Sequence, residues 1–185
     1  KKICFYTRNL EAAEKKQREA EELVHEALEN KWFYLVYQPQ FTLSDRKLRG
    51  FETLIRCKRP DGSVISPAEF IPAAEKTNLI FKIDDYVLKR AMEEFKPVLD
   101  EKDSDYIISV NVSAKNISTP DFALRVKKLL DETAFPARSL EIEITEYSLA
   151  DSMDITIANI QKLKDGEHFT GKIGAQDEFQ VEERR

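Results

Sequence analysis

Residues 51–57 read FETLIRC and predict a β-strand that carries charge on one of its two faces. Because side chains alternate along a strand, Glu52 and Arg56 share one face and Phe51 lies on the other. A bare carboxylate inside a strand is costly unless it is paired or binds a metal. The stretch therefore indicates either a structural ion pair or a functional site.

Two later stretches repeat the same two-faced pattern. Residues 107–113, IISVNVS, place Ser109 and Asn111 on one face, and residues 140–146, LEIEITE, place Glu141 and Glu143 on one face. The opposite face of each stretch is aliphatic, and we expect it to pack under helices. Three strands therefore direct oxygen-bearing side chains to one side of the predicted sheet.

Two interpretations fit this polar face. Two acids and an amide from neighbouring strands form the hard oxygen cluster that Mg²⁺, Mn²⁺ or Ca²⁺ prefers. Arg56 would then hold a phosphate that bridges to the metal. Alternatively, Glu52 pairs with Arg56 or a lysine, and Asn111 satisfies backbone groups. The spacing of the residues alone leaves both interpretations open.

The order of the predicted elements indicates the fold class. Residues 10–30 contain no Gly or Pro and predict a connecting helix, with a signalling or dimerising stalk as the alternative. Two strands joined by the short connection TLSDRK (42–47) predict an antiparallel opening pair. Helices and strands then alternate from residue 83 to residue 165, which predicts parallel strands with crossover helices in an α/β sheet or barrel. The strand at residues 139–146 lies between predicted helices at 119–133, with Pro120 at its start, and at 152–165.

Composition excludes several classes of protein. The chain has 185 residues, of which 42% are hydrophobic and 34% charged, as expected for one soluble domain or a domain with a fragment of another. A net charge of -5 argues against a partner that is a nucleic-acid polymer. Cys4 and Cys57 fit no metal spacing, and no apolar run is long enough to span a bilayer. We expect the chain to be a cytoplasmic piece of a longer protein. The cytosolic part of a membrane-anchored sensor is one form that such a piece could take.

Five motifs together resemble a known family. They are LVYQPQF (35–41), GFETLIR (50–56), ISPAEFIPAAE (65–75), SVNVS (109–113) and LEIEITE (140–146). Their order and spacing are similar to those of EAL domains, which are bacterial phosphodiesterases for cyclic di-GMP. The resemblance covers residues 33–164, and the signature triplet contains Thr53 where alanine is usual. It implies a partial TIM-like (β/α) barrel with an antiparallel first strand, preceded by a linker helix.

The resemblance also implies roles for individual residues. Glu52, Asn111 and Glu143 match the catalytic metal ligands, which in this family hold Mg²⁺ or Mn²⁺. Gln38 and Arg56 match positions that contact the dinucleotide, with Arg56 on its phosphate. One further match is Glu146, which steadies a loop that is important for metal binding and dimerisation. The family's reaction hydrolyses cyclic di-GMP to linear pGpG.

The same resemblance suggests a layout of the chain. Residues 1–9 resemble the end of a GGDEF domain, residues 10–30 are the connecting helix, residues 31–165 form the N-terminal part of an EAL domain, and residues 166–185 are a tail without a match. The family's DDFGTG motif is expected about thirty residues after Glu143, where the tail has no adjacent Asp pair. We interpret Asp177 and Glu178 as a look-alike of that pair, because no strand is predicted before them.

These differences shape the functional hypotheses. The intact parent is expected to be a cyclic di-GMP phosphodiesterase with an upstream GGDEF-like domain. This chain, which lacks half of the metal site, is expected to be inactive and to hold metal weakly or not at all. Its open sheet edge favours a homodimer or a domain-swapped assembly. A non-catalytic cyclic di-GMP receptor or a structural dimerisation module are the alternatives.

Overall fold

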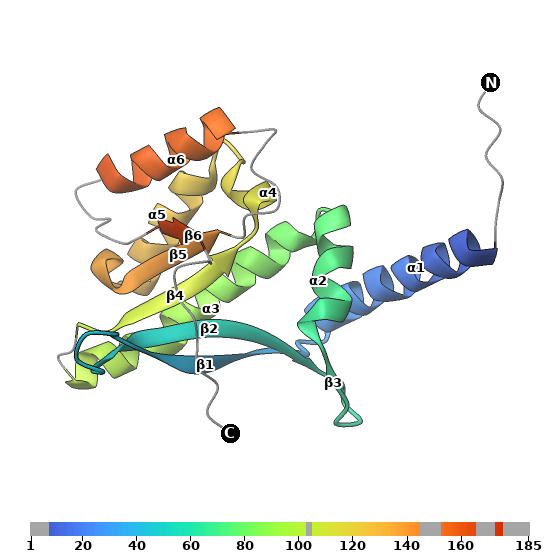
Figure 1. Cartoon of the computed structure of the whole chain (residues 1–185), viewed down its shortest axis with the longest axis horizontal. Coiled ribbons are helices and arrows are strands. Elements are labelled where there is room, and N and C mark those ends of the chain that lie inside the picture. The colour runs from blue at the N-terminus through green and yellow to red at the C-terminus, as the bar shows by residue number, and fades with distance from the viewer. Residues whose placement is uncertain (1–7, 103–104, 145–152, 166–172, 176–185) are drawn as a thin grey trace. The chain divides into compact units, whose positions relative to one another are not determined.

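A computed structural model of the chain describes residues 8–102, 105–144, 153–165 and 173–175 (Figure 1). The chain forms two compact units. The first unit comprises Lys1–Tyr34 and Arg56–Ile80, and the second comprises Leu35–Ile55 and Phe81–Arg185. Strand β2 (Leu48–Lys58) contributes residues to both units.

The first unit contains α1 (Arg8–Glu29), β3 (Val64–Ile65) and α2 (Pro67–Lys76). Helix α1 confirms the helix predicted after residue 10, and it packs against α2. Strand β3 pairs antiparallel with the end of β2. At the start of α2, Ser66 and Glu69 form a capping box and Pro67 occupies the first turn. Such a cap typically stabilises a helix by about 1 kcal/mol.

The second unit is built on a sheet with the strand order β1-β2-β4-β5-β6. Its strands are β1 (Phe33–Phe41), β2, β4 (Ile107–Val112), β5 (Leu140–Ile144) and β6 (Ile173–Ala175). Strands β1 and β2 form a hairpin, whose turn is closed by a hydrogen bond from Thr42 N to Lys47 O of 2.9 Å. Strands β2, β4, β5 and β6 run parallel to one another. The α/β class and the hairpin opening were both predicted from the sequence.

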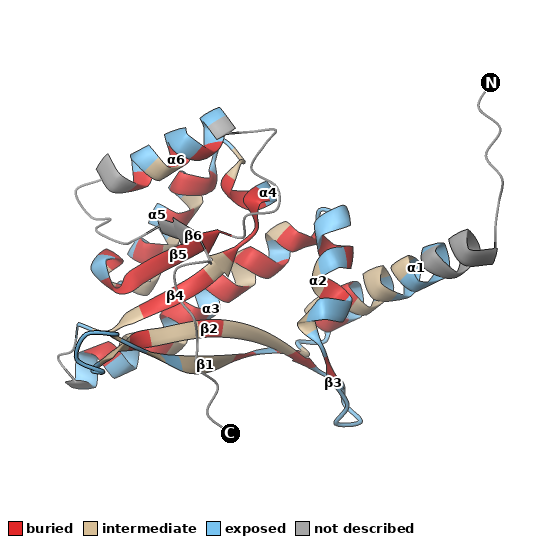
Figure 2. Cartoon of the chain, in the orientation of Figure 1, coloured by how far each residue is buried: buried red, intermediate tan, exposed pale blue. Residues whose placement is uncertain are grey.

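Strands β4 and β5 are largely buried, as Figure 2 shows in red, and their aliphatic residues belong to the core together with apolar residues of the helices. The ring of Phe51 packs on Phe95 of α3 (Leu79–Lys102) at 5.4 Å, which confirms the predicted hydrophobic face of β2. The other helices of this unit are α4 (Ala114–Ile117), the short η1 (Ala137–Ser139), α5 (Phe122–Thr133) and α6 (Met153–Asp165). Within the described ranges, none of the helices has both the length and the apolar character needed to cross a membrane.

The start of α5 differs from the prediction. The helix begins at Phe122 rather than at Pro120, and Asp121 is its N-cap residue. The preceding residues form a turn instead, because Phe122 N donates to Thr119 O at 3.2 Å. The side chain of Thr119 also donates to Asn116 O at 2.8 Å, which holds this turn against α4.

Strand β6 corrects the expectation that no strand precedes Asp177 and Glu178. Its residues pair parallel with β5, placing Ile173 beside Ile142 and Gly174 beside Glu143. The strand has only three residues and includes a glycine, so it shows no alternating hydrophobic pattern. Strand β6 is identified by its pairing with the backbone of β5, which the hydrophobic pattern of the sequence cannot reveal. The sheet therefore extends one strand further than predicted, and the two acids themselves lie outside the described residues.

Candidate functional site

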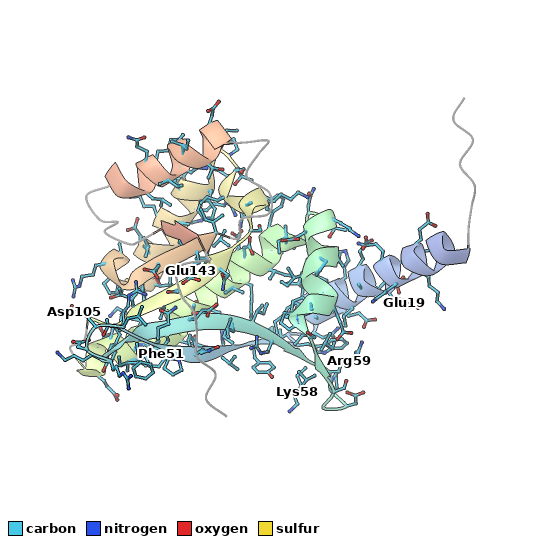
Figure 3. The ribbon with its side chains drawn as sticks, in the orientation of Figure 1. Glu19, Phe51, Lys58, Arg59, Asp105 and Glu143 are labelled. Carbon is cyan, nitrogen blue, oxygen red and sulfur yellow. The ribbon has the colours of Figure 1, made fainter. Side chains whose placement is uncertain are left out.

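Three adjacent strands bring the predicted metal ligands together. In the parallel register, Asn111 of β4 lies directly beside Glu143 of β5. Asn111 Nδ2 donates a hydrogen bond to Glu52 Oε1 of β2 at 2.9 Å. Glu52 and Asn111 are half-buried, and Glu143, which Figure 3 labels, is buried. The polar face predicted from alternation is therefore one continuous cluster.

Two buried oxygens in this cluster have no hydrogen-bond partner: Asn111 Oδ1 and Glu143 Oε1. Each such atom costs about 1–3 kcal/mol when it is left without a donor or a cation. Burial raises the pKa of Glu143, and the nearby charge of Glu52 raises it further. A hard cation would satisfy both orphaned oxygens and offset the repulsion between the two carboxylates.

The donor set therefore fits a divalent cation. Carboxylate and amide oxygens are ligands for Mg²⁺ and Mn²⁺, whereas sulfur and imidazole would favour other metals. Among the described residues, no group of three or more His, Cys, Asp or Glu side chains is placed to hold a metal ion. The cluster at Glu52 and Glu143 differs from such a group because its third ligand is the amide of Asn111.

A second polar cluster lies beside the ligands, and it was only partly visible in the sequence. Arg49 Nη1 donates to Glu141 Oε1 at 3.1 Å and to Gln40 Oε1 at 3.2 Å, while Nη2 pairs with Glu141 Oε2. Ser109 Oγ lies 2.9 Å from Glu141 Oε1 and 3.2 Å from Gln40 Oε1. The hydroxyl has one proton, and the carboxylate oxygen is the nearer acceptor. We call Gln40, Arg49, Ser109 and Glu141 the clamp layer.

Arg49 escaped the sequence analysis because alternation assigns it to the face of Phe51. A glycine follows it, and a Cβ atom on Gly50 would lie 2.0 Å from the carbonyl oxygen of Ile107 on β4. The two backbones therefore approach closely at the start of β2, where simple alternation fails. The glycine in an otherwise bulky strand was the signal that could have revealed this.

A buried acid next to the ligand strand was also missed. Asp84 of α3 accepts hydrogen bonds from Ser113 N at 3.1 Å and from Ser113 Oγ at 2.6 Å. Burial raises the pKa of Asp84 to about 6, although the bonds from Ser113 act in the opposite direction. Ser113 follows Asn111 by two residues and caps α4. Asp84 therefore anchors the end of the strand that carries Asn111.

The remaining predicted site residues are less defined. Gln38 is half-buried on β1, two residues before Gln40, and so lies on the same face of the strand as that residue. Arg56 is half-buried on β2 and belongs to the first unit. Glu146 lies outside the described residues. The substrate-binding roles of Gln38 and Arg56 and the loop-steadying role of Glu146 stay predictions.

Comparison with known proteins decides the family. A model of the EAL domain matches residues 21–167 of this chain. The chain belongs to the EAL domain family. It is 33% identical over 153 residues to the signaling protein YkoW of Bacillus subtilis, covering 83% of this chain and 19% of YkoW. It is 29% identical over 161 residues to the cyclic di-GMP phosphodiesterase NbdA of Pseudomonas aeruginosa, covering 87% of this chain and 21% of NbdA.

Solved EAL structures share the fold of this EAL-domain chain. The phosphodiesterase PaMucR, solved in complex with c-di-GMP, matches with a TM-score of 0.69 and 29% identity over 79% of this chain and 58% of that one. The EAL enzyme Bd1971 in its cGMP-bound form matches with a TM-score of 0.77 and 24% identity, covering 90% of this chain and 46% of that one. This chain therefore spans only part of these proteins, and the Bd1971 likeness bears on the fold alone.

Proposed function

We propose that this chain supplies the metal-binding and dinucleotide-binding strands of a cyclic di-GMP phosphodiesterase. One observation carries the proposal: the buried oxygens of Asn111 and Glu143 lack partners beside the carboxylate of Glu52. The name of NbdA and the c-di-GMP complex of PaMucR support the choice of substrate. The activity, substrate and partners of the whole protein all belong to this proposal.

The proposal assigns a task to five of the predicted residues. Glu52, Asn111 and Glu143 would hold Mg²⁺ or Mn²⁺, and the ion would supply positive charge for phosphodiester hydrolysis. Arg56 donates charge-assisted hydrogen bonds to a phosphate, and Gln38 contacts the dinucleotide. Hydrolysis of one ring phosphodiester opens cyclic di-GMP to linear pGpG.

Metal-dependent stability tests the ligand set. An ion at 100 times its Kd stabilises a folded protein by about 2.7 kcal/mol, so Mn²⁺ should raise the unfolding midpoint of the wild-type chain in urea. Glu143→Gln should lose most of this gain. The matched control is Glu132→Gln, which changes an exposed glutamate that pairs with Lys128 on α5. An equal Mn²⁺ response in Glu143→Gln and the control would contradict the assignment.

The pH dependence of metal binding gives a second test. Because the pKa of Glu143 is raised, protons compete with the cation at a higher pH than at an ordinary glutamate. Mn²⁺ affinity, measured by calorimetry, should therefore begin to decline at a higher pH than at a site built on an ordinary glutamate. If the affinity declined only at the pH where an ordinary glutamate is protonated, Glu143 would be excluded as a ligand with a raised pKa.

Product analysis separates the enzyme from the receptor alternative. Calorimetry should show that Arg56→Ala weakens cyclic di-GMP binding by about 1.5–3 kcal/mol, the usual range for a hydrogen bond to a charged group. Arg59→Ala, at an exposed position, is the control. Release of pGpG by the parent protein would establish the enzyme, whereas binding without product would favour the receptor. The inactivity of this chain, its assembly and its GGDEF partner stay predictions.

A further inference from the structure

The strands that carry the ligand cluster also carry the residues of the clamp layer. Ser109 lies two residues before Asn111 on β4, and Glu141 lies two residues before Glu143 on β5. Arg49 lies three residues before Glu52 on β2. Every strand that supplies a predicted metal ligand therefore also supplies a clamp residue just upstream, and Gln40 joins from β1.

The clamp spans the middle strand of the three. Strand β4 lies between β2 and β5, and Arg49 reaches across it from β2 to the carboxylate of Glu141 on β5. The pair is nearly closed to solvent, with side-chain exposures of 13% for Arg49 and 4% for Glu141. A guanidinium fork bonded to both carboxylate oxygens has a fixed planar geometry, so it restricts the separation of the two outer strands. Ser109 ties the middle strand to the same carboxylate.

The ligand cluster needs such a restraint. Glu52 and Glu143 sit on the two outer strands, and their like charges repel each other. Neither Asn111 Oδ1 nor Glu143 Oε1 has a donor that would hold it in place. The backbone pairing of the strands and the bond from Asn111 to Glu52 hold the ligands only in part, and the clamp is the further side-chain contact that lies nearest along the chain.

We propose that Arg49 and Glu141 are positioning residues that hold Glu52 and Glu143 at the spacing a small divalent cation requires. The inference rests on the proposed function, because it assumes that these carboxylates bind a cation. Mg²⁺ demands a near-ideal octahedron with ligands at about 2.0–2.1 Å, whereas Ca²⁺ accepts about 2.3–2.6 Å and flexible geometry. A clamp that fixes the spacing of Glu52 and Glu143 therefore favours Mg²⁺ over Ca²⁺. Loss of the clamp should reduce the ratio of Mg²⁺ affinity to Ca²⁺ affinity.

Calorimetric titration of the chain with Mg²⁺ and with Ca²⁺ tests the inference. Arg49→Lys keeps the positive charge but removes the fork, and it should lower Mg²⁺ affinity by about 10- to 100-fold, as loss of a supporting contact around a metal site typically does. Ca²⁺ affinity should fall much less. The matched control is Arg125→Lys, which changes another arginine paired with a carboxylate, because Arg125 Nη1 bonds both oxygens of Asp85 on α3. The control should leave the ratio of the two affinities unchanged.

Each outcome decides between the two proposals. If the wild-type chain binds Mg²⁺ and Arg49→Lys has the wild-type ratio of affinities, the clamp inference is wrong and the proposed metal site stands. If the wild-type chain binds neither ion, Glu52, Asn111 and Glu143 do not form a metal site in this chain, and the inference is wrong. Should Arg49→Lys not fold, Ser109→Ala removes the hydroxyl that contacts Glu141 and Gln40, leaves the pair of Arg49 with Glu141 in place, and should shift the ratio in the same direction. An equal loss of both affinities in Ser109→Ala would mean a general structural role and would overturn the inference.

Discussion

The ligand cluster and the clamp layer contain similar residues in similar surroundings, yet they differ in how their polar atoms are satisfied. Both lie on the same three strands, and both bury a carboxylate from β5. In the clamp layer, Glu141 accepts from Arg49 and Ser109. In the part of the chain that the structure describes, no buried side-chain oxygen or nitrogen of the clamp layer lacks a partner, whereas the ligand cluster has two such oxygens.

This difference distinguishes buried polar residues that stabilise the fold from those that are available to bind a ligand. A buried acid with a complete set of donors stabilises the fold in its ionised form, and removing its partner is costly. A buried acid with an orphaned oxygen and a like charge beside it is a liability to the metal-free chain. A bound cation would supply the missing partner of such a residue. Substitutions in the two clusters should therefore change stability in opposite directions.

The largest expected effect comes from Arg49→Met. This change leaves Glu141 buried without its counter-charge, so the free energy of unfolding should fall by about 3–5 kcal/mol. Urea denaturation at pH 7 measures the loss. Lys128→Met is the control, because Lys128 and Glu132 form an exposed pair on α5 that contributes only about 0.3–0.5 kcal/mol. A loss below about 1 kcal/mol in Arg49→Met would remove the contrast between the two clusters.

Asp84 is an intermediate case between the clamp layer and the ligand cluster. It is a buried acid that accepts hydrogen bonds, but none of its hydrogen-bond partners carries a positive charge. Its pKa is raised from an ordinary 3.8 to about 6, so the folded chain binds this proton more tightly than the unfolded chain does. The resulting stability is complete below about pH 4 and is lost as the pH rises through about 6.

Asp84→Asn removes this titration. Between pH 4 and pH 7, the unfolding free energy of the wild type should decline relative to the variant by about 2 kcal/mol, most of the total that follows from 1.36 kcal/mol per unit of pKa. Denaturation of both proteins across that pH range measures the difference. A difference that is independent of pH would show that Asp84 stays ionised throughout.

Glu143→Gln should stabilise the metal-free chain at pH 7. It removes one of two like charges, and a gain on the order of 1–2 kcal/mol is expected for partly buried groups. Glu141→Gln is the matched control, since the same substitution in the clamp layer weakens the pair with Arg49 and should destabilise. Denaturation in the presence of a chelator gives both values. Destabilisation by both substitutions would mean that the ligand cluster is structural.

Thr53→Val should have the smallest effect. The hydroxyl of Thr53 is buried without a partner, on the face of β2 opposite Glu52, so replacing it with a methyl group should add about 1 kcal/mol of stability. Thr156→Val is the control, because that buried hydroxyl lies 2.9 Å from Ser118 Oγ and its loss should destabilise. Thermal unfolding compares them. A loss of stability in Thr53→Val would reveal a hidden role for this departure from the usual alanine.

The sequence predicted those features that depend on a regular period. Alternation along β2, β4 and β5 placed Glu52, Asn111 and Glu143 on one face, because extended backbone has a fixed repeat of two. The prediction failed where the backbone departs from that repeat. Arg49 reaches the polar face beside a glycine, and β6 is recognisable only through its pairing with β5.

Asp84 was missed for a different reason. It is followed by Asp85 near the start of a long helix, where two acids are typical of a solvated surface. Only the packing of α3 on the end of β4 shows that Asp84 is buried and that Asp85 pairs with Arg125. Contacts between segments distant in the sequence are therefore what pattern analysis cannot supply.

Gly50 also limits the registers in which β2 can pair with β4. If β2 slipped by one residue along β4, Arg49 or Phe51 would stand where Gly50 now stands, and a Cβ would be driven to about 2 Å from the carbonyl oxygen of Ile107. A slip of one residue also turns every side chain of a strand to the opposite face. The missing side chain at position 50 thus excludes the arrangement in which Glu52 would be buried among the helices, and selects the one in which it meets Asn111.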